Sequence, residues 1–470
     1  MYMNSLTLNQ LITNQLAFEP THQQATLISM LSEFICKPSE HKAFIINGYA
    51  GTGKTSVISG LIQALNRTEL KTVLLAPTGR AAKVLSNYSG HSAYSIHKII
   101  YRQKSAGTDE FNINYNKCKN TVFIIDEASM ISNTATDNTK FGSGKLLDDL
   151  IEYIYTGDNC CMILLGDIAQ LPPIFQHNSP ALNADIIKHY GLDTETFSLT
   201  EVLRQSSESG ILYNATMIRN AISNNDISPI HFDVDFKDIT KVSGEELIDL
   251  INSSYSNVGQ ENTIILTYSN KRATLYNRGI RNQVLMKESE LSNGDFLMIT
   301  KNNYFWSKPY ENLDFIANGD IAEIIRVGHF HEMYGARFAD ITMRLIDYDM
   351  EVTARIIIDS LYADTASATE ELNTKILNGM LEDYEVPVSK QQFWKDAQQN
   401  EYYNALQVKF AYAITGHKAQ GGAWQHVFID QGYLTREMIT KEYYQWLYTA
   451  VTRATEKLYL VNFSSFFFNE

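Results

Sequence analysis

The sequence is poor in cysteine, and the spacing of its cysteines excludes the common metal and redox motifs. Its 4 cysteines are Cys36, Cys118, Cys160 and Cys161, and no two have the C-x-x-C spacing of a zinc ribbon or a redox pair. Cys160 and Cys161 are adjacent in the apolar run CCMILLGD, which predicts a buried strand. We therefore expect buried free thiols and a reducing compartment.

Long apolar segments and targeting signals are also missing. No stretch reaches the roughly 20 apolar residues of a membrane-spanning helix. The first residues, MYMNSLTLNQ, lack the basic and then apolar pattern of a signal peptide. A cytoplasmic protein without membrane contact is expected. With 470 residues, 44% hydrophobic and 20% charged, the chain suits a folded protein of about two to four domains.

Positive charge is scarce overall but concentrated in three segments. The net charge of −14 argues against a general nucleic-acid coat protein. Residues 70–108, 263–287 and 402–429 nevertheless contain no acidic residue and carry +6, +5 and +2, which leaves −27 on the remainder. Aromatic residues occur among these cations, namely Tyr88, Tyr94, Tyr101, Tyr268, Tyr276 and Trp424. Basic segments with aromatic rings favour single-stranded nucleic acid, although most individual rings are expected to face the core.

Short apolar runs alternate with helix-like segments along most of the chain. The apolar runs are residues 43–47, 72–77, 121–126, 162–167, 263–268, 426–430 and 457–463, and the clearest helical segments are 56–66, 79–87 and 145–155. This alternation predicts an α/β fold with parallel sheets covered on both faces. Because four runs end by about residue 170 and three lie beyond 260, we expect two α/β halves.

Three stretches interrupt this alternation. Residues 91–120 contain two polar and aromatic arms around Gly107, which predicts a β-hairpin. Residues 132–144 are small and polar, which predicts a surface loop. Residues 325–405 contain β-like runs followed by a charged helical stretch, which predicts a small inserted domain.

Residues 48–56, GYAGTGKTS, form a phosphate-binding motif between an expected strand and an expected helix. Gly48 and Gly53 let backbone N–H groups approach phosphate, and the helix contributes its positive N-terminal end. Lys54 is expected to reach the β- and γ-phosphates, and the Thr55 hydroxyl to ligate Mg²⁺. ATP or another NTP is the expected substrate. The expected nucleotide contacts in this motif are Gly48, Ala50, Gly51, Thr52, Gly53, Lys54, Thr55 and Ser56.

A second motif, TVFIIDEAS at 121–129, supplies two carboxylates. The preceding apolar residues place Asp126 and Glu127 at the carboxyl end of a strand, where ligands bind in open α/β sheets. Asp126 is expected to hold Mg²⁺ through water, and Glu127 to orient or deprotonate the attacking water. An acidic pair alone is a common surface feature, but beside the phosphate-binding motif it predicts NTP hydrolysis.

Three further residues could respond to the γ-phosphate. Gln170, in LLGDIAQLPP at 164–173, could contact the phosphate and its water, or it could simply belong to a turn before two prolines. Arg204 in LTEVLRQ and Arg453 in LYTAVTRA could stabilise charge on the transferring phosphoryl group, an effect of about a thousandfold or more in rate. A lone arginine is more often part of a surface ion pair.

Together the motifs resemble a superfamily 1 helicase. In chain order they are PTHQQ (20–24), GYAGTGKT (48–55), LLAPTGRAAKVL (74–85), SIH (95–97), IIDEASM (124–130), LLGDIAQLPP (164–173), LTEVLRQ (199–205), ILTYSN (265–270), ITGHKAQGG (414–422) and YTAVTRA (448–454). The combination of GD-x-x-QLPP, HKAQG and YTAVTRA resembles superfamily 1B, the RecD and phage Dda-like branch. Two departures are Tyr49, where the family often has proline, and Gly422, where it often has serine.

The resemblance implies a domain organisation and a direction of movement. It implies two tandem RecA-like domains, 1–205 and 206–470, with a β-hairpin insert at 91–120 and an SH3-like β insert at 325–405. It also implies an ATP-dependent DNA helicase that translocates 5′ to 3′ on single-stranded DNA and unwinds duplex in replication, recombination or repair. We expect a monomeric motor acting on single strands and single/double-strand junctions, with replication or repair proteins as partners.

The resemblance also assigns residues by motif position. Gln24 would contact the adenine edge, Gly422 would lie beside the nucleotide, and Arg204 and Arg453 would be the two arginine fingers. The residues expected to contact DNA are Pro77, Thr78 and His97 in the first half, Thr267, Asn270, Thr415, His417 and Lys418 in the second, and Phe111 at the tip of the hairpin.

Three other functions remain open from the sequence. The chain could be a single-strand translocase that displaces proteins without unwinding duplex. It could instead be a nucleotide-switched ATPase that binds a partner protein, although the basic segments argue against this. A nuclease–helicase is disfavoured, because no separate acidic cluster is apparent and little chain length remains for a nuclease domain.

Overall fold

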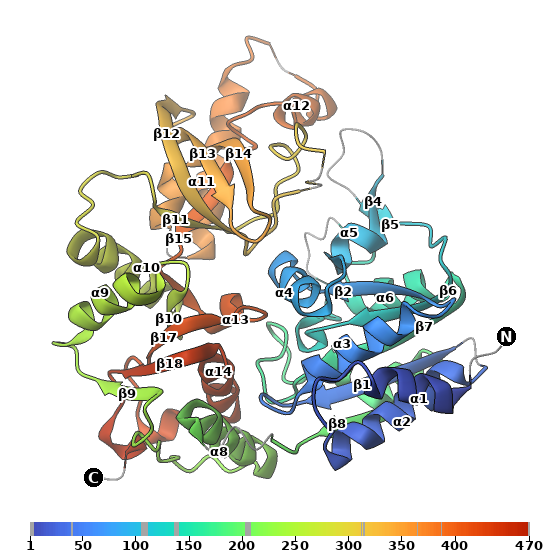
Figure 1. The fold of residues 1–470 in the computed structure, drawn as a ribbon. Helices are drawn as coiled ribbons and strands as arrows, with labels where there is room; N and C mark the ends of the chain where they lie inside the picture. Colours follow the sequence, from blue (N-terminus) through green and yellow to red (C-terminus); the bar gives the residue numbers. More distant parts are fainter. Residues whose placement is uncertain are drawn as a thin grey trace.

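The computed structural model contains two parallel sheets and a small barrel (Figure 1). It describes residues 4–38, 41–104, 111–135, 141–202, 208–311, 313, 315–363, 365–386 and 388–468. We call residues up to 202 the first half and residues from 208 onward the second half. The predicted α/β class is correct for both halves.

The first half is built on a six-stranded parallel sheet in the order β3-β2-β6-β7-β1-β8. Its strands are β1 (Lys42–Gly48), β2 (Lys71–Ala76), β3 (Ala93–Ser95), β6 (Lys119–Ile125), β7 (Asp158–Gly166) and β8 (Asp193–Leu199). The helices are α1 (Ser5–Thr13), α2 (His22–Cys36), α3 (Lys54–Leu65), α4 (Gly79–Ser89), α5 (Ile96–Ile100), α6 (Leu146–Tyr155) and α7 (Ala184–His189).

Both faces of this sheet are buried, which explains its uninterrupted apolar strands. In β1, Phe44 and Ile46 pack with α1, α2 and α3 on one face, while Ala43 and Ile45 pack with α5 and α6 on the other. The expected buried cysteines, Cys160 and Cys161, lie on opposite faces of β7. The carboxyl ends of these strands all meet at one edge of the sheet, where the phosphate-binding motif lies.

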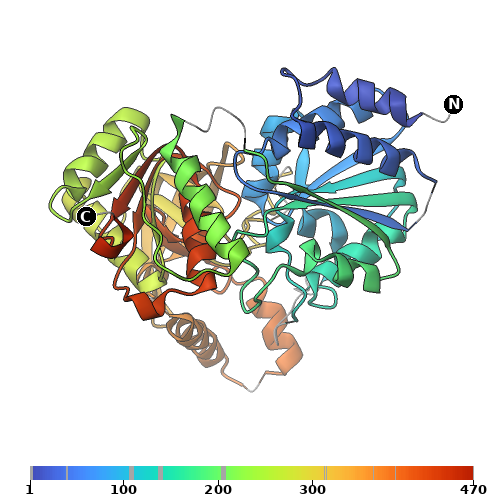
Figure 2. The ribbon, with the colours of Figure 1, turned by 90° about the horizontal axis from the view of Figure 1, so that it is seen from below.

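The second half contains a five-stranded parallel sheet in the order β16-β10-β17-β18-β9. Its strands are β9 (Ile239–Val242), β10 (Thr263–Thr267), β16 (Ala413–Thr415), β17 (Trp424–Asp430) and β18 (Ala454–Val461). The associated helices are α8 (Gly210–Asn224), α9 (Leu247–Val258), α10 (Asn270–Gly279), α13 (Gly416–Ala419) and α14 (Lys441–Val451), and a π-helix, Ile280–Val284, continues α10. Figure 2 shows the two sheets side by side with helices around each.

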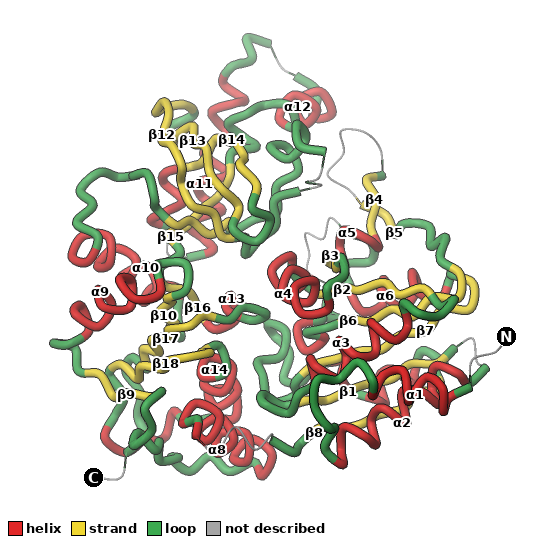
Figure 3. Tube along the Cα trace, in the orientation of Figure 1, coloured by secondary structure: helices red, strands yellow, loops and turns green. Residues whose placement is uncertain are grey.

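The predicted insert is a closed five-stranded barrel that is longer than expected. Its strands are β11 (Phe296–Ile299), β12 (Ile321–Met333), β13 (Ala336–Leu345), β14 (Met350–Ile357) and β15 (Leu406–Phe410), with α11 (Ala366–Glu382) and α12 (Lys390–Ala397) beside it (Figure 3). The barrel therefore extends beyond the predicted 325–405 at both ends. The short strands β11 and β15 are not among the apolar runs that the sequence predicts as strands.

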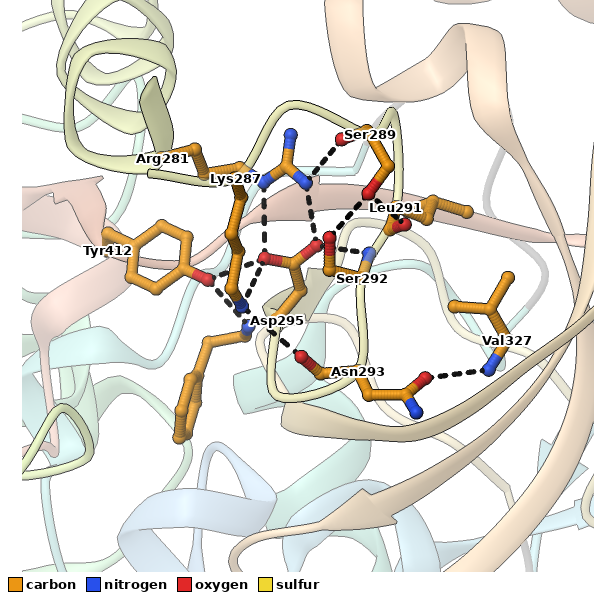
Figure 4. Close-up of polar contacts among 10 residues, drawn as sticks. Arg281, Lys287, Ser289, Leu291, Ser292, Asn293, Asp295, Val327 and Tyr412 are labelled. Atoms are coloured by element: carbon orange, nitrogen blue, oxygen red, sulfur yellow. Dashed lines mark hydrogen bonds and ion pairs between the residues drawn. The ribbon is translucent and has the colours of Figure 1, made fainter. Parts of the chain in front are cut away.

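One buried carboxylate joins the barrel to the π-helix that continues α10 (Figure 4). Asp295, just before β11, is fully buried and accepts hydrogen bonds from Arg281, Lys287, the Tyr412 hydroxyl and the Ser292 N–H. A buried charge is tolerated when its partners are as complete as these. The barrel is thereby held on the π-helix that carries Arg281.

The predicted hairpin is shorter than residues 91–120. Among the described residues of this range, only β4 (Tyr101–Gln103) and β5 (Phe111–Ile113) pair as a hairpin, whereas β3 joins the main sheet beside β2. The residues at 105–110, between its two strands, lie outside the described residues. In the part of the chain that the structure describes, no helix has the length and apolar character needed to span a bilayer.

Candidate active site and nucleic-acid interface

The phosphate-binding loop joins β1 to α3 in a conformation that requires glycine. Gly51 and Gly53 have φ values of 74° and 75°, in the left-handed region, and α3 begins immediately afterwards at Lys54. A Cβ atom at Gly48 would lie 2.8 Å from Lys54 Cδ. The loop therefore fits closely around the start of α3 and surrounds its N-terminal end, where Thr55 and Ser56 follow. This arrangement suits phosphate oxygens.

Gln24 and Gln23 connect α2 to two parts of the site. Gln24 is fully buried, forms a capping box with Thr21, and donates from Nε2 to the Thr52 carbonyl at 3.0 Å. Its amide therefore supports the phosphate-binding loop, and its contact with adenine stays a prediction. Gln23, which the sequence did not single out, accepts from the Thr200 N–H at 2.8 Å.

Arg204, the first predicted arginine finger, lies outside the described residues. Thr200 and Glu201, which precede it, are held by Gln23, whose Oε1 also accepts from the Glu201 N–H at 2.9 Å. The role of Arg204 stays a prediction.

Asp126 follows β6, as predicted, and has an unexpected partner in Tyr88. The Tyr88 hydroxyl donates to Asp126 Oδ2 at 2.7 Å, and the Glu127 N–H donates to Asp126 Oδ1 at 2.8 Å. Burial, together with Asp126, raises the pKa of Tyr88 well above its usual value, so the hydroxyl remains a donor. Tyr88 therefore orients the carboxylate expected to hold Mg²⁺ and does not belong to a DNA-binding surface.

Glu127 is strained and incompletely hydrogen-bonded. Its φ of 50° is unusual for a residue with a side chain, and its buried Oε2 atom has no hydrogen-bond partner within the described residues. Burial raises the pKa of Glu127, whereas Lys54 and Arg453 oppose that rise. The residue thus has a strained backbone and a carboxylate with an unused oxygen near two cations. This arrangement is expected of a group that receives a proton from water.

Gln170 lies between the two halves and has its own unused atom. Its Oε1 is buried without a hydrogen-bond partner among the residues that the structure describes. Asp167, three residues earlier, is buried and accepts from the Tyr448 hydroxyl at 2.6 Å and from the Ala169 N–H at 2.9 Å. Burial raises the pKa of Asp167, and Lys54 opposes that rise.

Arg453 is buried and held by neutral acceptors. Its guanidinium donates to the carbonyls of Thr449 and Gly422 at 3.0 and 3.1 Å and to Thr452 Oγ1 at 3.1 Å. No ion pair to a carboxylate is present for it within the described ranges. These hydrogen bonds fix the orientation of the guanidinium, and its positive charge remains available to bind an anion.

Gly422 acts through its backbone. Besides accepting from Arg453, it lies under Arg80 and Trp424, so that a Cβ there would come within 2.8 Å of Arg80 Nε and 2.7 Å of the Trp424 ring. The Arg80 guanidinium lies 4.0 Å from the centre of that ring, which joins α4 of the first half to β17 of the second. A side chain at position 422 would therefore require Arg80 or Trp424 to move.

These residues fit a magnesium nucleotide. The loop around the start of α3 and the unused oxygens of Glu127 and Gln170 provide a phosphate site and two groups for a water molecule. In the described part of the chain, no cluster of three or more His, Cys, Asp and Glu side chains could hold a metal alone. A metal ion would therefore need phosphate oxygens in addition to Asp126 and Thr55.

The predicted DNA contacts of the first half differ in how far they are exposed to solvent. Pro77 is buried at the end of β2, and Thr78 caps α4 by accepting from the Ala81 N–H at 3.1 Å. His97 is half-buried, with its ring 5.0 Å from that of Phe141, and burial lowers its pKa to about 4. His97 is therefore neutral near pH 7 and would contact a strand without adding charge.

Phe111 does not lie at the hairpin tip. It pairs with Gln103 in the hairpin ladder, and its ring lies 4.8 Å from those of both Phe141 and Tyr304. Phe141 comes from the predicted surface loop, and Tyr304 comes from the segment between β11 and β12. The hairpin is thus joined to the barrel segment by an aromatic cluster, which the sequence could not reveal because its members lie far apart.

The second half places some predicted contacts at its surface and buries others. Asn270 is exposed at the start of α10, and Thr415 and His417 are half-buried, with burial lowering the pKa of His417. Burial and the nearby Lys409 lower the pKa of Lys418 to about 8, and Lys418 donates to Asn318.

Thr267 is the exception among these residues. It is fully buried, and its hydroxyl donates to the Ser269 carbonyl at 3.0 Å. The structure therefore does not support a direct side-chain contact between Thr267 and a strand.

The basic segment at 263–287 is less available than its charge suggests. Arg272 pairs with Asp430, while Arg281 and Lys287 pair with Asp295, so that Lys271 and Arg278 are the exposed cations. Of the aromatic residues in the three basic segments, some are exposed and others buried. Tyr94 and Tyr268 are 37% and 52% exposed, whereas Tyr101 and Trp424 are buried.

The chain matches known families and proteins. A model for the AAA domain matches residues 22–227, and a model for the UvrD-like helicase C-terminal domain matches 410–461. An uncharacterised protein of Acanthamoeba polyphaga mimivirus is 26% identical, with 93% of this chain and 98% of that protein covered. The ATP-dependent DNA helicase dda of Enterobacteria phage T4 is 27% identical, with 67% and 70% covered. A Bacteroides Pif1 helicase with ADP-AlF3 and ssDNA has a TM-score of 0.48 and 14% identity, with 96% and 95% covered.

Proposed function

This chain belongs to the superfamily 1B helicases, the ATP-dependent DNA helicases of the RecD, Dda and Pif1 branch, and we propose that it moves 5′ to 3′ along single-stranded DNA and unwinds duplex. We propose that it works as a monomer at single/double-strand junctions in replication, recombination or repair, with proteins of those pathways as partners.

The connection between the two halves at Leu171 supports this proposal most directly. Leu171 follows Gln170 in the first half, and both of its backbone groups bond to the second half. Its N–H donates to Thr449 Oγ1 at 2.9 Å, and its carbonyl accepts from Gln420 Nε2 at 2.7 Å. A shift of Gln170 during hydrolysis would therefore pull on two segments of the second half.

The proposed hydrolysis uses residues from both halves. When bound, the magnesium nucleotide supplies the phosphoryl group that is transferred to water. Lys54 and the N–H groups at the start of α3 would hold the phosphates, and Asp126 with Thr55 would hold the metal. Glu127 would orient the attacking water and accept its proton, and Arg453 would stabilise the negative charge that develops on the phosphoryl oxygens.

The proposed movement depends on separate grips by the two halves. The first half offers the exposed cations Lys83 and Lys98 with Tyr94, whose ring lies 5.3 Å from Lys98 Nζ. The second half offers Tyr268 and Lys418. Cations and exposed rings hold a single strand without reading its sequence. Closing and opening of the nucleotide site would change the distance between the grips and so advance the protein.

The hairpin β4–β5 is the proposed wedge for duplex separation. Its contact with Phe141 and Tyr304 would hold it still against the incoming duplex. A strand-separation assay with Phe111→Ala tests this role. If that variant unwinds duplex normally, the wedge assignment is wrong; if it hydrolyses ATP and displaces bound proteins but fails only to unwind, the assignment is supported.

ATP hydrolysis in the presence of single-stranded DNA tests the proposed function as a whole. The wild-type chain should be stimulated by single strands, and Lys54→Ala should lose that hydrolysis. Wild-type turnover in Lys54→Ala would contradict the assigned site. A wild-type rate that ignores single-stranded DNA would instead favour a nucleotide-switched ATPase that binds a partner protein.

A further inference from the structure

The second half contacts the phosphate-binding loop itself, in addition to supplying Arg453. The Ala50 N–H donates to the Tyr448 hydroxyl at 3.0 Å. Next to it, a Cβ atom on Gly51 would lie 3.1 Å from Leu212 Cδ2, so this part of the loop is already in close contact with α8. These contacts lie on consecutive residues of the loop.

A third contact lies on the preceding residue. The Arg219 guanidinium, also on α8, is 4.6 Å from the centre of the Tyr49 ring. Helices α8 and α14 pack against each other, and Figures 1 and 2 show α8 on the side of the second half that faces the first. The loop is therefore covered along residues 49–51 by one helix pair of the second half.

The Tyr448 hydroxyl has two partners in the first half. It accepts from the Ala50 N–H and donates to Asp167 Oδ2 at 2.6 Å. Tyr448 and Asp167 are 1% and 2% exposed, so neither partner is replaced readily by water. Burial and Asp167 raise the pKa of Tyr448 well above its usual value, which keeps the hydroxyl a donor.

Arg453 follows Tyr448 along the chain, just beyond the end of α14 at Val451. The guanidinium of Arg453 is held by the carbonyl of Thr449, the residue that follows Tyr448. A movement of Tyr448 at the loop would therefore also move Thr449 and, through the Thr449 carbonyl, the guanidinium of Arg453. This link does not require the γ-phosphate, because it exists in the protein alone.

We propose that Tyr448 is a positioning residue that couples the phosphate-binding loop to the second half, so that its hydroxyl sets the position of Arg453 from Ala50 and Asp167. This inference rests on the proposed helicase function and adds a specific residue to it. Nucleotide binding at residues 51–55 would shift the loop and, through this hydroxyl, would displace α14. This effect would add to that of any contact between Arg453 and the nucleotide.

Tyr444 provides a matched control on the same helix. It is fully buried one turn before Tyr448, and its hydroxyl donates to the Ser228 carbonyl. Both Tyr444 and Ser228 belong to the second half. Tyr444→Phe and Tyr448→Phe therefore remove the same atom from the same helix, but only the second change removes a link between the halves.

The test measures how strongly a nucleotide changes the affinity for DNA. The dissociation constant for a single-stranded oligonucleotide is measured with and without magnesium and a non-hydrolysable ATP analogue, for the full chain and both variants. The ratio of the two constants is the coupling factor, and it must be reciprocal between the two ligands. Unfolding midpoints are measured alongside, so that lost coupling is distinguished from lost folding.

We expect Tyr448→Phe to reduce the coupling factor about tenfold, the usual effect of losing the partner of a buried charged group. In steady-state hydrolysis its DNA-stimulated kcat should fall more than its KM for ATP rises. Asp167→Asn should give a smaller loss of coupling, since the hydroxyl keeps a neutral acceptor. Tyr444→Phe should retain the wild-type factor.

Two results would overturn the inference, and a third concerns the function instead. A wild-type coupling factor in a folded Tyr448→Phe protein would show that the hydroxyl is only a packing group. An equal loss in Tyr444→Phe would show that any change in this helix has the same effect. If the wild-type chain hydrolyses ATP without responding to single strands, the proposed function fails, and with it the premise of the coupling.

Discussion

The hydroxyl of Tyr88 donates to Asp126 Oδ2 at 2.7 Å and connects α4 to the end of β6. A hydrogen bond to a charged group contributes about 1.5–3 kcal/mol when it is buried. The bond also fixes which way the carboxylate faces, and the other oxygen is held by the Glu127 N–H. The position of the proposed metal-binding group thus depends on a tyrosine outside the recognised motifs.

Tyr88→Phe should therefore raise the magnesium concentration needed for half-maximal hydrolysis. We also expect the free energy of unfolding to fall by about 1–2 kcal/mol. Magnesium titrations of the hydrolysis rate and urea denaturation check the two effects. Tyr115→Phe, at an exposed position of the same half, serves as the control. Identical magnesium dependence in wild type and Tyr88→Phe would show that the bond does not position Asp126.

Glu127→Gln should separate nucleotide binding from hydrolysis. The amide has the same shape but accepts no proton from water, so we expect kcat to fall about a hundredfold or more while ATP binding persists. Turnover and equilibrium binding of a fluorescent ATP analogue measure the two properties. A variant with more than a tenth of the wild-type rate would exclude Glu127 as the base.

The pH dependence of hydrolysis should reflect the burial of Glu127. Burial raises its pKa, so the carboxylate that accepts a proton is lost at a higher pH than for an ordinary glutamate at about 4.3. As pH falls, kcat should decline with a midpoint above that value. A profile of kcat against pH, recorded where unfolding is absent, checks this. An unchanged rate down to pH 4 would contradict it.

Binding of single-stranded DNA should take up a proton at Lys418. In the free protein its pKa is lowered to about 8, and a phosphate nearby would raise it again. Between pH 8 and the pKa of the bound state, Lys418 is mostly neutral before binding and charged afterwards. Calorimetry at pH 9 in buffers of different ionisation enthalpy measures the uptake. Lys418→Arg should abolish it, because arginine is charged throughout; equal uptake in both proteins would remove Lys418 from the contact.

Asp320 should reduce stability as pH rises. Burial raises its pKa to about 7, against about 3.9 in an unfolded chain, so the folded state binds the proton more tightly. The stability of the folded state that depends on the protonated Asp320 carboxyl is fully present below pH 4 and is lost as pH rises through 7. Asp320→Asn should then be more stable than wild type at pH 8, by on the order of 4 kcal/mol. Urea denaturation at pH 5 and pH 8 checks this; equal differences at both pH values would contradict it.

The sequence predicts those parts of the fold that local patterns determine. Strands buried on both faces are recognisable as apolar runs, which is why β1, β2, β6, β7, β10, β17 and β18 were all anticipated. The edge strand β8, DTETFSL, was missed because its residues are mostly polar and only the last of them, Leu199, is buried. The motifs likewise predict that Lys54 begins a helix and that Asp126 and Glu127 follow a strand. The structure places them so, because each position is set by its neighbours in the chain.

Contacts between distant segments are what the sequence could not supply. Arg281 and Lys287 count as free cations until Asp295 is placed between them. Phe111 becomes part of an aromatic cluster once Tyr304 is brought beside it. Tyr88 becomes a partner of Asp126 once α4, packed against β2 and β3, brings it to the end of β6. Each of these roles depends on tertiary packing, for which a single sequence holds no periodic signal.

The most direct test of the account is unwinding of short duplexes that carry a single-stranded tail at either the 5′ or the 3′ end, with ATP and magnesium. The account predicts unwinding from the 5′ tail and none from the 3′ tail, and no unwinding of either by Lys54→Ala. Unwinding only from the 3′ tail would contradict the proposed direction, and single-strand-stimulated hydrolysis without any unwinding would contradict the helicase activity itself.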